Sequence, residues 1–392
     1  MPVPNRIAEF HDELVAWRRE LHRFPELAFE ERRTAEFVAE KLRAFGLDEV
    51  HTHIGGTGVV GVLHGRRPGP CIGLRADMDA LPIVEASGVP WASQVPGRMH
   101  ACGHDGHVTM LLGAARLLAE TRHFAGTVCF IFQPAEEGAA GAKRMIEDGL
   151  FARFPIERVF GLHNWPWLPR GTFAVHAGPV MAAADRFDIV LCGRGCHGAM
   201  PHVGRDPVTA AAALVQALQV LVARETDPLA SAVVTVGSIH AGEAYNVVPD
   251  RAKLTGTVRA LEEAVRQRLE DRIRQMAHQL AAAFDLEAEV DYRLGYPPTV
   301  NDRAEAERAA QAAAMVVGEQ AVRRDLPPCM GAEDFAFMLQ ERPGAYVWLG
   351  TGSAAEGRIL HSPLYDFDDE SIPYGAGYWV AIVETCLPTA GT

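Results

Sequence analysis

The first part of the chain alternates between helical and strand-like patterns of apolar residues. Apolar side chains recur at helical spacing from Ile7 to Leu21, and a second helical stretch over 31–45 ends before Gly46. Short apolar runs bounded by glycine, proline or polar residues predict buried strands over 58–63, 71–75, 127–133 and 158–163. Helical patterns separate several of them, over 108–121 and 138–148. This alternation predicts an α/β layer with a largely parallel sheet.

The segment 185–297 has a different order of elements. Asp206 and Pro207 have the residue types of a helix cap and a first helical position. The pattern predicts, in order, a strand over 186–192, a helix over 207–224, strands over 232–239 and 252–259, a helix over 261–284 and a strand over 287–294. This β-α-β-β-α-β order is that of a ferredoxin-like split unit. One complete unit of this kind predicts an inserted domain with its own core.

The α/β pattern returns after Pro297, with a helix predicted over 302–317, a strand over 345–349 and a helix over 374–387. We therefore expect an α/β fold in which a mostly parallel-sheet domain comprises residues 1–184 and 298–392. A ferredoxin-like domain of residues 185–297 is inserted into it. The length of 392 residues also favours two domains over one.

Composition and charge narrow the class of protein. The chain is 48% hydrophobic and 22% charged, as in ordinary globular proteins. Its formal net charge is −13 with no run of basic residues, which argues against a nucleic-acid partner. No apolar stretch is long enough for a membrane span, and the first residues lack the apolar region of a signal peptide. Seven scattered cysteines favour a reducing compartment, so we expect a cytoplasmic protein.

Two segments carry candidate metal ligands and acid–base groups. Cys102 and His104 lie two residues apart in the glycine-flanked stretch MHACGHDGH (99–107). Thiolate and imidazole are good ligands for zinc and similar ions, although a buried cysteine beside a helix-capping histidine explains the pair equally well. Glu136 and Glu137 end an apolar strand in QPAEEG (133–138). Such a strand end is where α/β sheets bind ligands, but a solvated pair at a helix N-terminus is the simpler alternative.

Two histidines lie in similar positions. His163 ends an apolar strand in GLHNWPWLPRG (161–171), and His361 lies in a polar loop, LHSPLYDF (360–367), before the last helix. A single histidine is more often structural than a ligand. Four candidate segments in one α/β layer are harder to explain separately, and together they favour a metal site.

The sequence resembles a known family through a series of motifs that span nearly the whole chain. It is similar to the co-catalytic metallo-aminoacylase and carboxypeptidase family, in the branch of hippurate hydrolases, N-acyl-amino-acid amidohydrolases and indole-acetyl-amino-acid hydrolases. Besides the segments above, the motifs that carry the resemblance are LRADMDALP (74–82), GRGCHGAMPH (193–202), YNVVPD (245–250), GTVR (256–259) and GAEDF (331–335).

The resemblance implies two divalent metal ions about 3.5–4 Å apart, which clamp a bridging water and the scissile carbonyl. Cys102 matches the bridging ligand, which is aspartate in the wider family, and His104, Glu137, His163 and His361 match the other ligands. Glu136 matches the general base. Many relatives have a metal-binding histidine where this chain has Asp77. Asp77 or Asp79 is expected to orient a metal-binding imidazole, and the sequence leaves open which one does so.

The resemblance also assigns residues outside the metal site. His197 matches a histidine that reaches into the active site of the other subunit and stabilises the oxyanion. Asn246 and Arg259 match groups that bind the carboxylate or amide of the substrate, and Gly331 matches a loop near the substrate. The inserted domain is then a lid and a dimerisation surface, so we expect a homodimer or a higher homo-oligomer.

The function implied is hydrolysis of the amide bond of N-acyl-L-amino acids such as hippurate or N-acetyl amino acids. A metal-bound hydroxide attacks the carbonyl, and Glu136 acts as the base. The metals are zinc, manganese, nickel or cobalt. One alternative is a metallo-dipeptidase or carboxypeptidase-like peptide hydrolase with the same metal site. A second is a catalytically silent binding protein on the same scaffold.

Overall fold

The computed structural model describes residues 5–389, which form two compact units. Unit 1 consists of the chain up to Gly178, Val300–Pro327 and the chain from Asp334 onward. Unit 2 consists of Pro179–Thr299 and Pro328–Glu333. Each unit has its own hydrophobic core, so each is described separately.

Unit 1 is built on an eight-stranded sheet with the order β1-β2-β4-β3-β5-β16-β6-β15. The central neighbours β4, β3, β5 and β16 run parallel, whereas β1 and β2 add an antiparallel edge. The strands are β1 (Glu49–Ile54), β2 (Gly58–His64), β3 (Arg67–Asp77), β4 (Ala125–Gln133), β5 (Arg158–Trp165), β6 (Phe173–Ala174), β15 (Val322–Arg323) and β16 (Gly344–Gly350). The mixed α/β class with a mostly parallel central sheet is confirmed.

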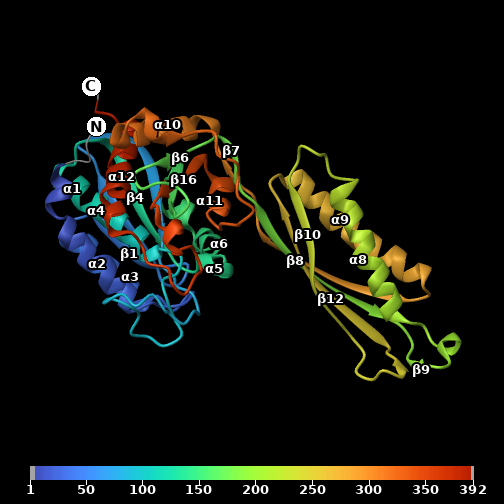
Figure 1. Cartoon of the computed structure of the whole chain (residues 1–392). Helices are drawn as coiled ribbons and strands as arrows, with labels where there is room; N and C mark the ends of the chain where they lie inside the picture. Colours follow the sequence, from blue (N-terminus) through green and yellow to red (C-terminus); the bar gives the residue numbers. More distant parts are fainter. Residues whose placement is uncertain (1–4, 390–392) are drawn as a thin grey trace. The chain divides into compact units, whose positions relative to one another are not determined.

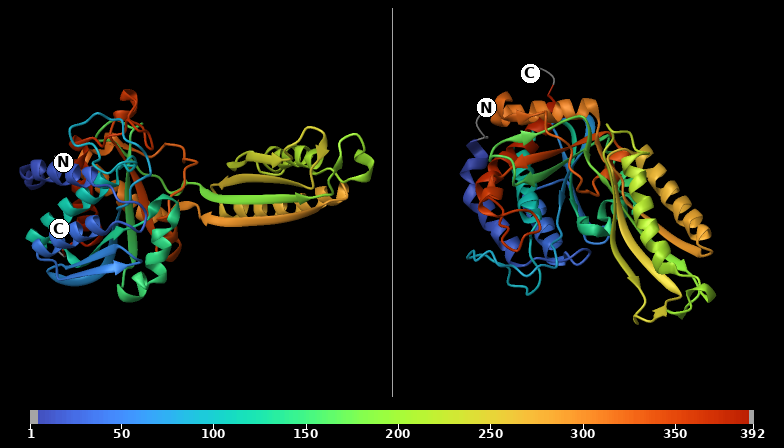
Figure 2. Two further views of the ribbon diagram at one scale, coloured as in Figure 1. Left: turned by 90° about the horizontal axis from the view of Figure 1, so that it is seen from below. Right: turned by 45° about the vertical axis from the view of Figure 1, so that its right-hand side comes forward.

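Helices cover this sheet, and their apolar faces form the core of unit 1 (Figures 1 and 2). The longer ones are α2 (His11–Arg23), α3 (Arg32–Ala44), α4 (His104–Thr121), α10 (Arg303–Val317) and α12 (Ile372–Cys386). The shorter ones are α1 (Asn5–Glu9), α5 (Glu136–Ala139), α6 (Gly141–Glu147), α7 (Leu150–Arg153) and α11 (Ala336–Glu341). Within residues 5–389, none of the helices is both long and apolar enough to cross a bilayer.

The parallel strands bring their carboxyl ends to one edge of the sheet. Strand β3 ends at Asp77, β4 ends just before the Glu136–Glu137 pair, and β5 carries His163 near its end. Helix α4 begins at His104, directly after Cys102 and Gly103. Segments distant in sequence therefore present their polar side chains at the same edge.

Unit 2 contains the β-α-β-β-α-β succession expected from the sequence. Its four-stranded sheet has the order β10-β12-β8-β13, with every neighbouring pair antiparallel. The two helices pack side by side on one face of this sheet (Figure 2). The elements are β8 (Ala183–Cys192), α8 (Pro207–Ala223), β10 (Ala232–Ala241), β12 (Arg251–Ala260), α9 (Glu263–Ala283) and β13 (Glu287–Tyr296). The side chain of Asp206 caps α8 by accepting the Val208 N–H at 2.8 Å, as the sequence indicated.

Several local predictions were wrong in detail. The helix expected over 138–148 is broken at Ala140, whose φ is 58°, so that α5 and α6 are separate. The pattern from Ile7 to Leu21 comprises two helices, because α1 ends before Phe10 and α2 starts at His11. The sequence patterns also missed β1 and the short strands β6, β7 (Gly178–Met181), β9 (Cys196–His197), β11 (Val247–Val248), β14 (Thr299–Asn301) and β15.

Candidate metal centre

Five candidate donor residues form two groups that share one sulfur ligand. Cys102 lies with His104 and His163 in one group and with Glu137 and His361 in the other, and within each group the donor atoms lie within 4.8 Å of one another. Cys102 Sγ is 3.3 Å from His163 Nε2, and His361 Nε2 is 3.1 Å from Glu137 Oε1. The five residues matched to metal ligands in the sequence therefore converge in unit 1, with Cys102 in the shared position.

Backbone geometry at Gly103 places Cys102 and His104 in this cluster. Gly103 has φ 89°, in the left-handed region that favours glycine. A Cβ atom there would lie 2.4 Å from Asn164 Oδ1 and 2.5 Å from the hydroxyl oxygen of Tyr365. A second contact places His361 near the same turn, because the His361 N–H donates to the Ala101 carbonyl at 2.8 Å. Thus the 101–104 turn holds two donors directly and anchors the loop that carries a third.

The Glu136–Glu137 turn is held by a buried carboxylate. Asp79 Oδ1 accepts the Glu136 N–H at 3.0 Å, and Asp79 Oδ2 accepts the Glu137 N–H at 2.9 Å. Glu136 is buried and Glu137 is half-buried. Both belong to a third group of donors with His104. The two carboxylates of this turn therefore lie beside the same imidazole.

Asp77 and Asp79 make their shortest imidazole contacts with different rings, a point the sequence left open, although Asp77 Oδ2 also lies 3.8 Å from His104 Nε2. His104 Nδ1 lies 2.8 Å from the Asp79 carbonyl oxygen and 3.3 Å from Asp79 Oδ1. His107 Nδ1 lies 2.6 Å from Asp77 Oδ1, while its Nε2 lies 2.7 Å from Asn164 Oδ1. Asp79 thus contacts Nδ1 of His104, whereas Nε2, on the other side of the ring, is the position for a ligand. Asp77 holds the neighbouring ring of His107.

The electrostatics of this cluster favour a cation. Burial, together with the carboxylates of Glu137, Glu136 and Asp77, raises the pKa of the Cys102 thiol well above its ordinary value. Burial alone would lower the pKa of His104, but Asp77 and then Asp79 raise it to about 10. Burial and His107 lower the pKa of His163. Around Cys102 and His104 the site therefore stabilises added positive charge, as protons or as metal ions, whereas the lowered pKa keeps His163 in the neutral form that binds a metal.

The donor set fits a pair of metal ions. Among the residues that the structure describes, Nε2 of the buried His104 ring has no hydrogen-bond partner, which is unusual for a buried ring nitrogen. The Asp79 contacts at Nδ1 leave this Nε2 available to a ligand. One thiol, three imidazoles and a carboxylate are a suitable set for zinc or a related ion. Cys102, Glu137 and His361 could hold one ion, and Cys102, His104 and His163 the other.

The other candidate residues from the sequence lie in unit 2, near two opposite ends of its sheet. His197 on β9 pairs with Val247 on β11, and the Gly198 N–H donates to the Asn246 carbonyl at 2.7 Å. His197 and Asn246 are therefore neighbours, and both are exposed. They lie beyond the end of β12 that begins at Arg251.

Arg259 and Gly331 lie toward the other end of unit 2. Arg259 on β12 pairs with Ala184 on β8, and the Gly331 carbonyl accepts the Ala182 N–H at 2.9 Å. At about 3.3 Å per residue, the eight steps from Arg251 to Arg259 span about 26 Å. Within unit 2, His197 and Asn246 are therefore far from Arg259 and Gly331.

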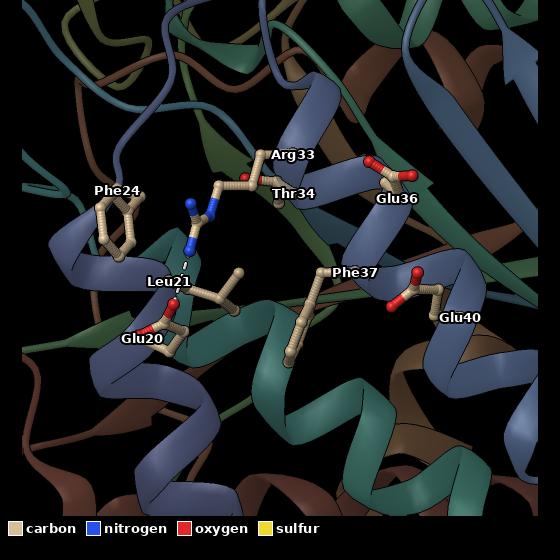
Figure 3. A pocket seen from close by; sticks show the side chains of 8 residues that line it. All are labelled: Glu20, Leu21, Phe24, Arg33, Thr34, Glu36, Phe37 and Glu40. Atoms are coloured by element: carbon tan, nitrogen blue, oxygen red, sulfur yellow. Dashed lines mark hydrogen bonds and ion pairs between the residues drawn. The ribbon is translucent and has the colours of Figure 1, made fainter.

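A separate pocket in unit 1 lies between α2 and α3 (Figure 3). It has a volume of about 200 Å³, and Arg33 forms an ion pair with Glu20 at 2.6 Å beside it. It is lined by Glu20, Leu21, Phe24, Arg33, Thr34, Glu36, Phe37 and Glu40. None of the five candidate metal ligands belongs to this lining, so the pocket is a feature separate from the donor cluster.

Sequence reasoning missed two residues that support the cluster. Asn164 contacts His107, donates from Nδ2 to the Tyr365 hydroxyl at 2.8 Å, and lies next to His163 in the LHNWP motif. Glu31 is buried and accepts the Ala135 N–H at 2.9 Å, directly before Glu136. The motif around His163 could have indicated Asn164, whereas no pattern in the sequence singled out Glu31.

Comparison with known proteins agrees with this geometry. The model of peptidase family M20/M25/M40 matches residues 73–385. The chain belongs to this family. It is 39% identical to an N-acetylcysteine deacetylase of Bacillus subtilis, over 97% of this chain and 98% of the relative. It is 41% identical to a hippurate hydrolase of Campylobacter jejuni, over 96% and 97% of the two chains. The branch expected from the motifs is therefore confirmed.

A solved member of the M20 family has the same fold. The crystal structure of Bacillus subtilis YXEP, described as a dinuclear metal-binding peptidase, matches with a TM-score of 0.85 and 38% identity, over 97% of this chain and 99% of the other. Together with the donor groups that share Cys102, this match supports two divalent metal ions in this chain. The chain is thus an M20-family hydrolase, and the alternative of a catalytically silent scaffold is not supported.

Proposed function

We propose that this M20-family protein is a two-metal amidohydrolase that cleaves the amide bond of N-acyl-L-amino acids. The observation that carries the proposal is the pair of donor groups sharing Cys102, with Glu136 beside them. The relatives described as N-acetylcysteine deacetylase and hippurate hydrolase support the substrate class. Both names describe cleavage of an acyl group from an amino acid.

Five residues would hold the metals, which we take to be zinc, manganese, nickel or cobalt. Cys102 would contribute to both ions, His104 and His163 to one, and Glu137 and His361 to the other. When bound, two such ions polarise the scissile carbonyl and lower the pKa of water. Asp79 would orient His104 through Nδ1, and Asp77 would fix His107 behind it.

Glu136 is the residue we assign to proton transfer. Its main chain is fixed by Asp79, and its carboxylate lies beside His104 and Glu137 without belonging to either group that contains Cys102. A carboxylate in this position accepts the proton of the attacking water and returns it to the leaving amine. The buried position of Glu136 keeps bulk water away from the transferred proton.

The residues of unit 2 are proposed to bind the substrate and the developing oxyanion. Arg259, with its planar guanidinium, suits the free carboxylate of an N-acyl amino acid, and Gly331 would line the site nearby. His197 would stabilise the oxyanion, and Asn246 would help to bind the substrate. One small substrate cannot contact both ends of a sheet about 26 Å apart. This spacing supports a homodimer in which His197 and Asn246 act on the partner's substrate.

We propose a cytoplasmic location for the protein. All seven cysteines lie among the described residues and are free thiols, as expected in a reducing compartment.

A substrate panel tests the proposed function. Protein stripped with a chelator and reloaded separately with zinc, manganese, nickel or cobalt is assayed with hippurate, N-acetyl amino acids and unblocked dipeptides. The proposal predicts cleavage of the N-acyl amino acids, and loss of this cleavage in the Glu136→Gln protein. Faster cleavage of dipeptides than of all acylated substrates, with every metal, would instead identify a peptide hydrolase.

A further inference from the structure

A fully buried carboxylate, Glu31, reaches the candidate catalytic turn from a distant part of the chain. Glu31 lies between α2 and α3 and has 0% exposure. Its Oε1 accepts the N–H groups of Phe29 at 3.0 Å and Ala135 at 2.9 Å. Its Oε2 accepts the Thr57 hydroxyl at 2.5 Å. Ala135 is the residue directly before Glu136.

The backbone at Ala135 needs such support. Ala135 has φ 55°, in the left-handed region that a residue with a Cβ atom seldom adopts. A conformation of this kind persists only where surrounding contacts determine it. Glu31 accepts the N–H of Ala135, and Asp79 accepts those of Glu136 and Glu137. Two buried carboxylates therefore hold three consecutive N–H groups of the turn.

The loop that carries Glu31 also contacts the Asp79 segment. The Glu26 carbonyl accepts the Ala80 N–H at 2.8 Å, and Leu27 forms a parallel bridge with Ala80. Residues 26–31 thus touch both segments that define the turn, one next to Asp79 and one next to Glu136. A shift of this loop would move the two segments relative to each other.

We propose that Glu31 is a positioning residue, whose carboxylate fixes the left-handed turn at Ala135 and so sets the direction of the Glu136 and Glu137 side chains. This inference rests on the proposed function for the roles of those two glutamates. Placement matters because an error of about 1 Å at a reacting group can lower turnover about 100-fold.

A purely stabilising role explains Glu31 less well. Burial raises the pKa of Glu31 to about 7, against the hydrogen bonds from Thr57 and Ala135 that lower it. Keeping this carboxylate ionised inside the protein is therefore unfavourable, and its contacts offset only part of the cost. Glu31 accepts the N–H groups of Phe29 and Ala135, whose φ angles are 62° and 55°, and this role accounts for its place in the fold.

Three variants at this position separate the roles. Glu31→Gln can keep every contact, because its carbonyl oxygen accepts both N–H groups and its amide can donate to Thr57. We expect its kcat within about 3-fold of wild type. Glu31→Ala removes the acceptor, and we expect kcat to fall about 10- to 100-fold with KM changed less than about 3-fold at saturating metal. Glu31→Asp keeps the charge, but its shorter side chain moves the carboxylate away from the two N–H groups. We therefore expect a kcat between those of wild type and Glu31→Ala. This variant tests the proposal even if Glu31→Ala fails to fold.

Glu26 offers a matched control in the same loop. Its carboxylate accepts the N–H groups of Arg33 at 3.1 Å and Thr34 at 2.9 Å, at the start of α3, whereas its contact with Ala80 uses the main chain. Glu26→Ala should lower stability but leave kcat within about 3-fold of wild type. An equal loss of kcat in the two alanine variants would reduce Glu31 to a structural residue and overturn the proposal.

Two readouts do not depend on turnover. Hydrogen exchange of the amides of residues 135–139 should accelerate in Glu31→Ala and Glu31→Asp but not in Glu31→Gln. Titration with zinc should show about 10- to 100-fold weaker binding of one of the two equivalents in Glu31→Ala, because Glu137 is displaced. If the wild-type protein cleaves no N-acyl amino acid, the proposed function fails while these readouts still test the turn. Unchanged exchange and unchanged zinc affinity would refute the role of Glu31.

Discussion

Replacing Arg18 by methionine should destabilise unit 1 strongly. Arg18 on α2 is completely buried, and its guanidinium donates to Asp369 at 2.6 Å and to Asp366 at 3.0 Å, with Asp105 at 3.7 Å. Methionine fills a similar volume but leaves three carboxylates without this cation. Breaking a buried ion pair by removing one partner costs about 3–5 kcal/mol.

The structure places Arg18→Met toward the lower end of that range. Each carboxylate keeps another donor or cation: His22 contacts Asp105 at 2.8 Å, Trp91 donates to Asp366 at 3.0 Å and Arg19 donates to Asp369 at 2.9 Å. We therefore expect a loss of about 3 kcal/mol in the free energy of unfolding at pH 7. The loss should be smaller near pH 5, because a carboxylate left without its cation takes up a proton more readily.

Urea unfolding followed by tryptophan fluorescence measures this effect in unit 1 alone. All six tryptophans of the chain lie in unit 1. A loss of about 3 kcal/mol corresponds to a midpoint lower by about 1 M urea. The control is Arg33→Met, whose ion pair with Glu20 is 55% and 40% exposed and should contribute less than about 1 kcal/mol (Figure 3). Equal midpoints for the two variants would refute the reasoning from burial.

Three further predictions concern pH, catalysis and assembly. Burial alone would lower the pKa of His22, but Asp105 raises it to about 9. Protonated His22 therefore stabilises the fold fully below pH about 6.5, and this stabilisation is lost as the pH rises through 9. The urea midpoint of wild type should fall over this range relative to that of His22→Gln, and parallel curves would exclude the effect. Glu136→Gln should bind both metals normally but lose about 100- to 10,000-fold in kcat, and near-normal turnover would remove Glu136 from the mechanism. If the proposed homodimer forms, mixing subunits of inactive His197→Ala and inactive Arg259→Ala should restore up to about a quarter of wild-type activity, because half of the dimers would be mixed and each would have one intact site. Mixed dimers can be isolated through two different tags. If they showed no hydrolytic activity, the proposal that His197 acts on the partner's substrate would be contradicted.

Much of the fold follows from local patterns in the sequence. The buried strands β2, β4 and β5 coincide closely with uninterrupted apolar runs, because a sheet covered on both faces requires them. Strand β1 was missed because its sequence, EVHTHI, lies at the sheet edge and carries polar side chains exposed to solvent. The break at Ala140 was missed because a positive φ at alanine is set by surrounding contacts and has no residue signature.

The candidate site could be predicted less completely. His163 lies near the end of one strand of the parallel sheet and Glu137 follows another, so topology alone indicates that they meet. His361 lies in a loop, so topology does not place it, and its assignment as a ligand came from the resemblance to a family. The partners of Asp77 and Asp79 could not be assigned, since either carboxylate reaches an imidazole at similar spacing along the chain. The contact of Glu31 with Ala135 joins residues 104 positions apart, and no local pattern encodes it.

The most direct test of the account is the coordination of metal by Cys102. Chelator-treated wild-type protein and its Cys102→Ala variant are titrated with cobalt(II), and the ultraviolet absorption of thiolate–cobalt bonds is recorded together with the bound metal by elemental analysis. The account predicts two equivalents of cobalt and a thiolate band in wild type, with no band and fewer equivalents in the variant. Two equivalents bound by Cys102→Ala, or a wild-type spectrum without the band, would contradict a metal pair joined by this sulfur.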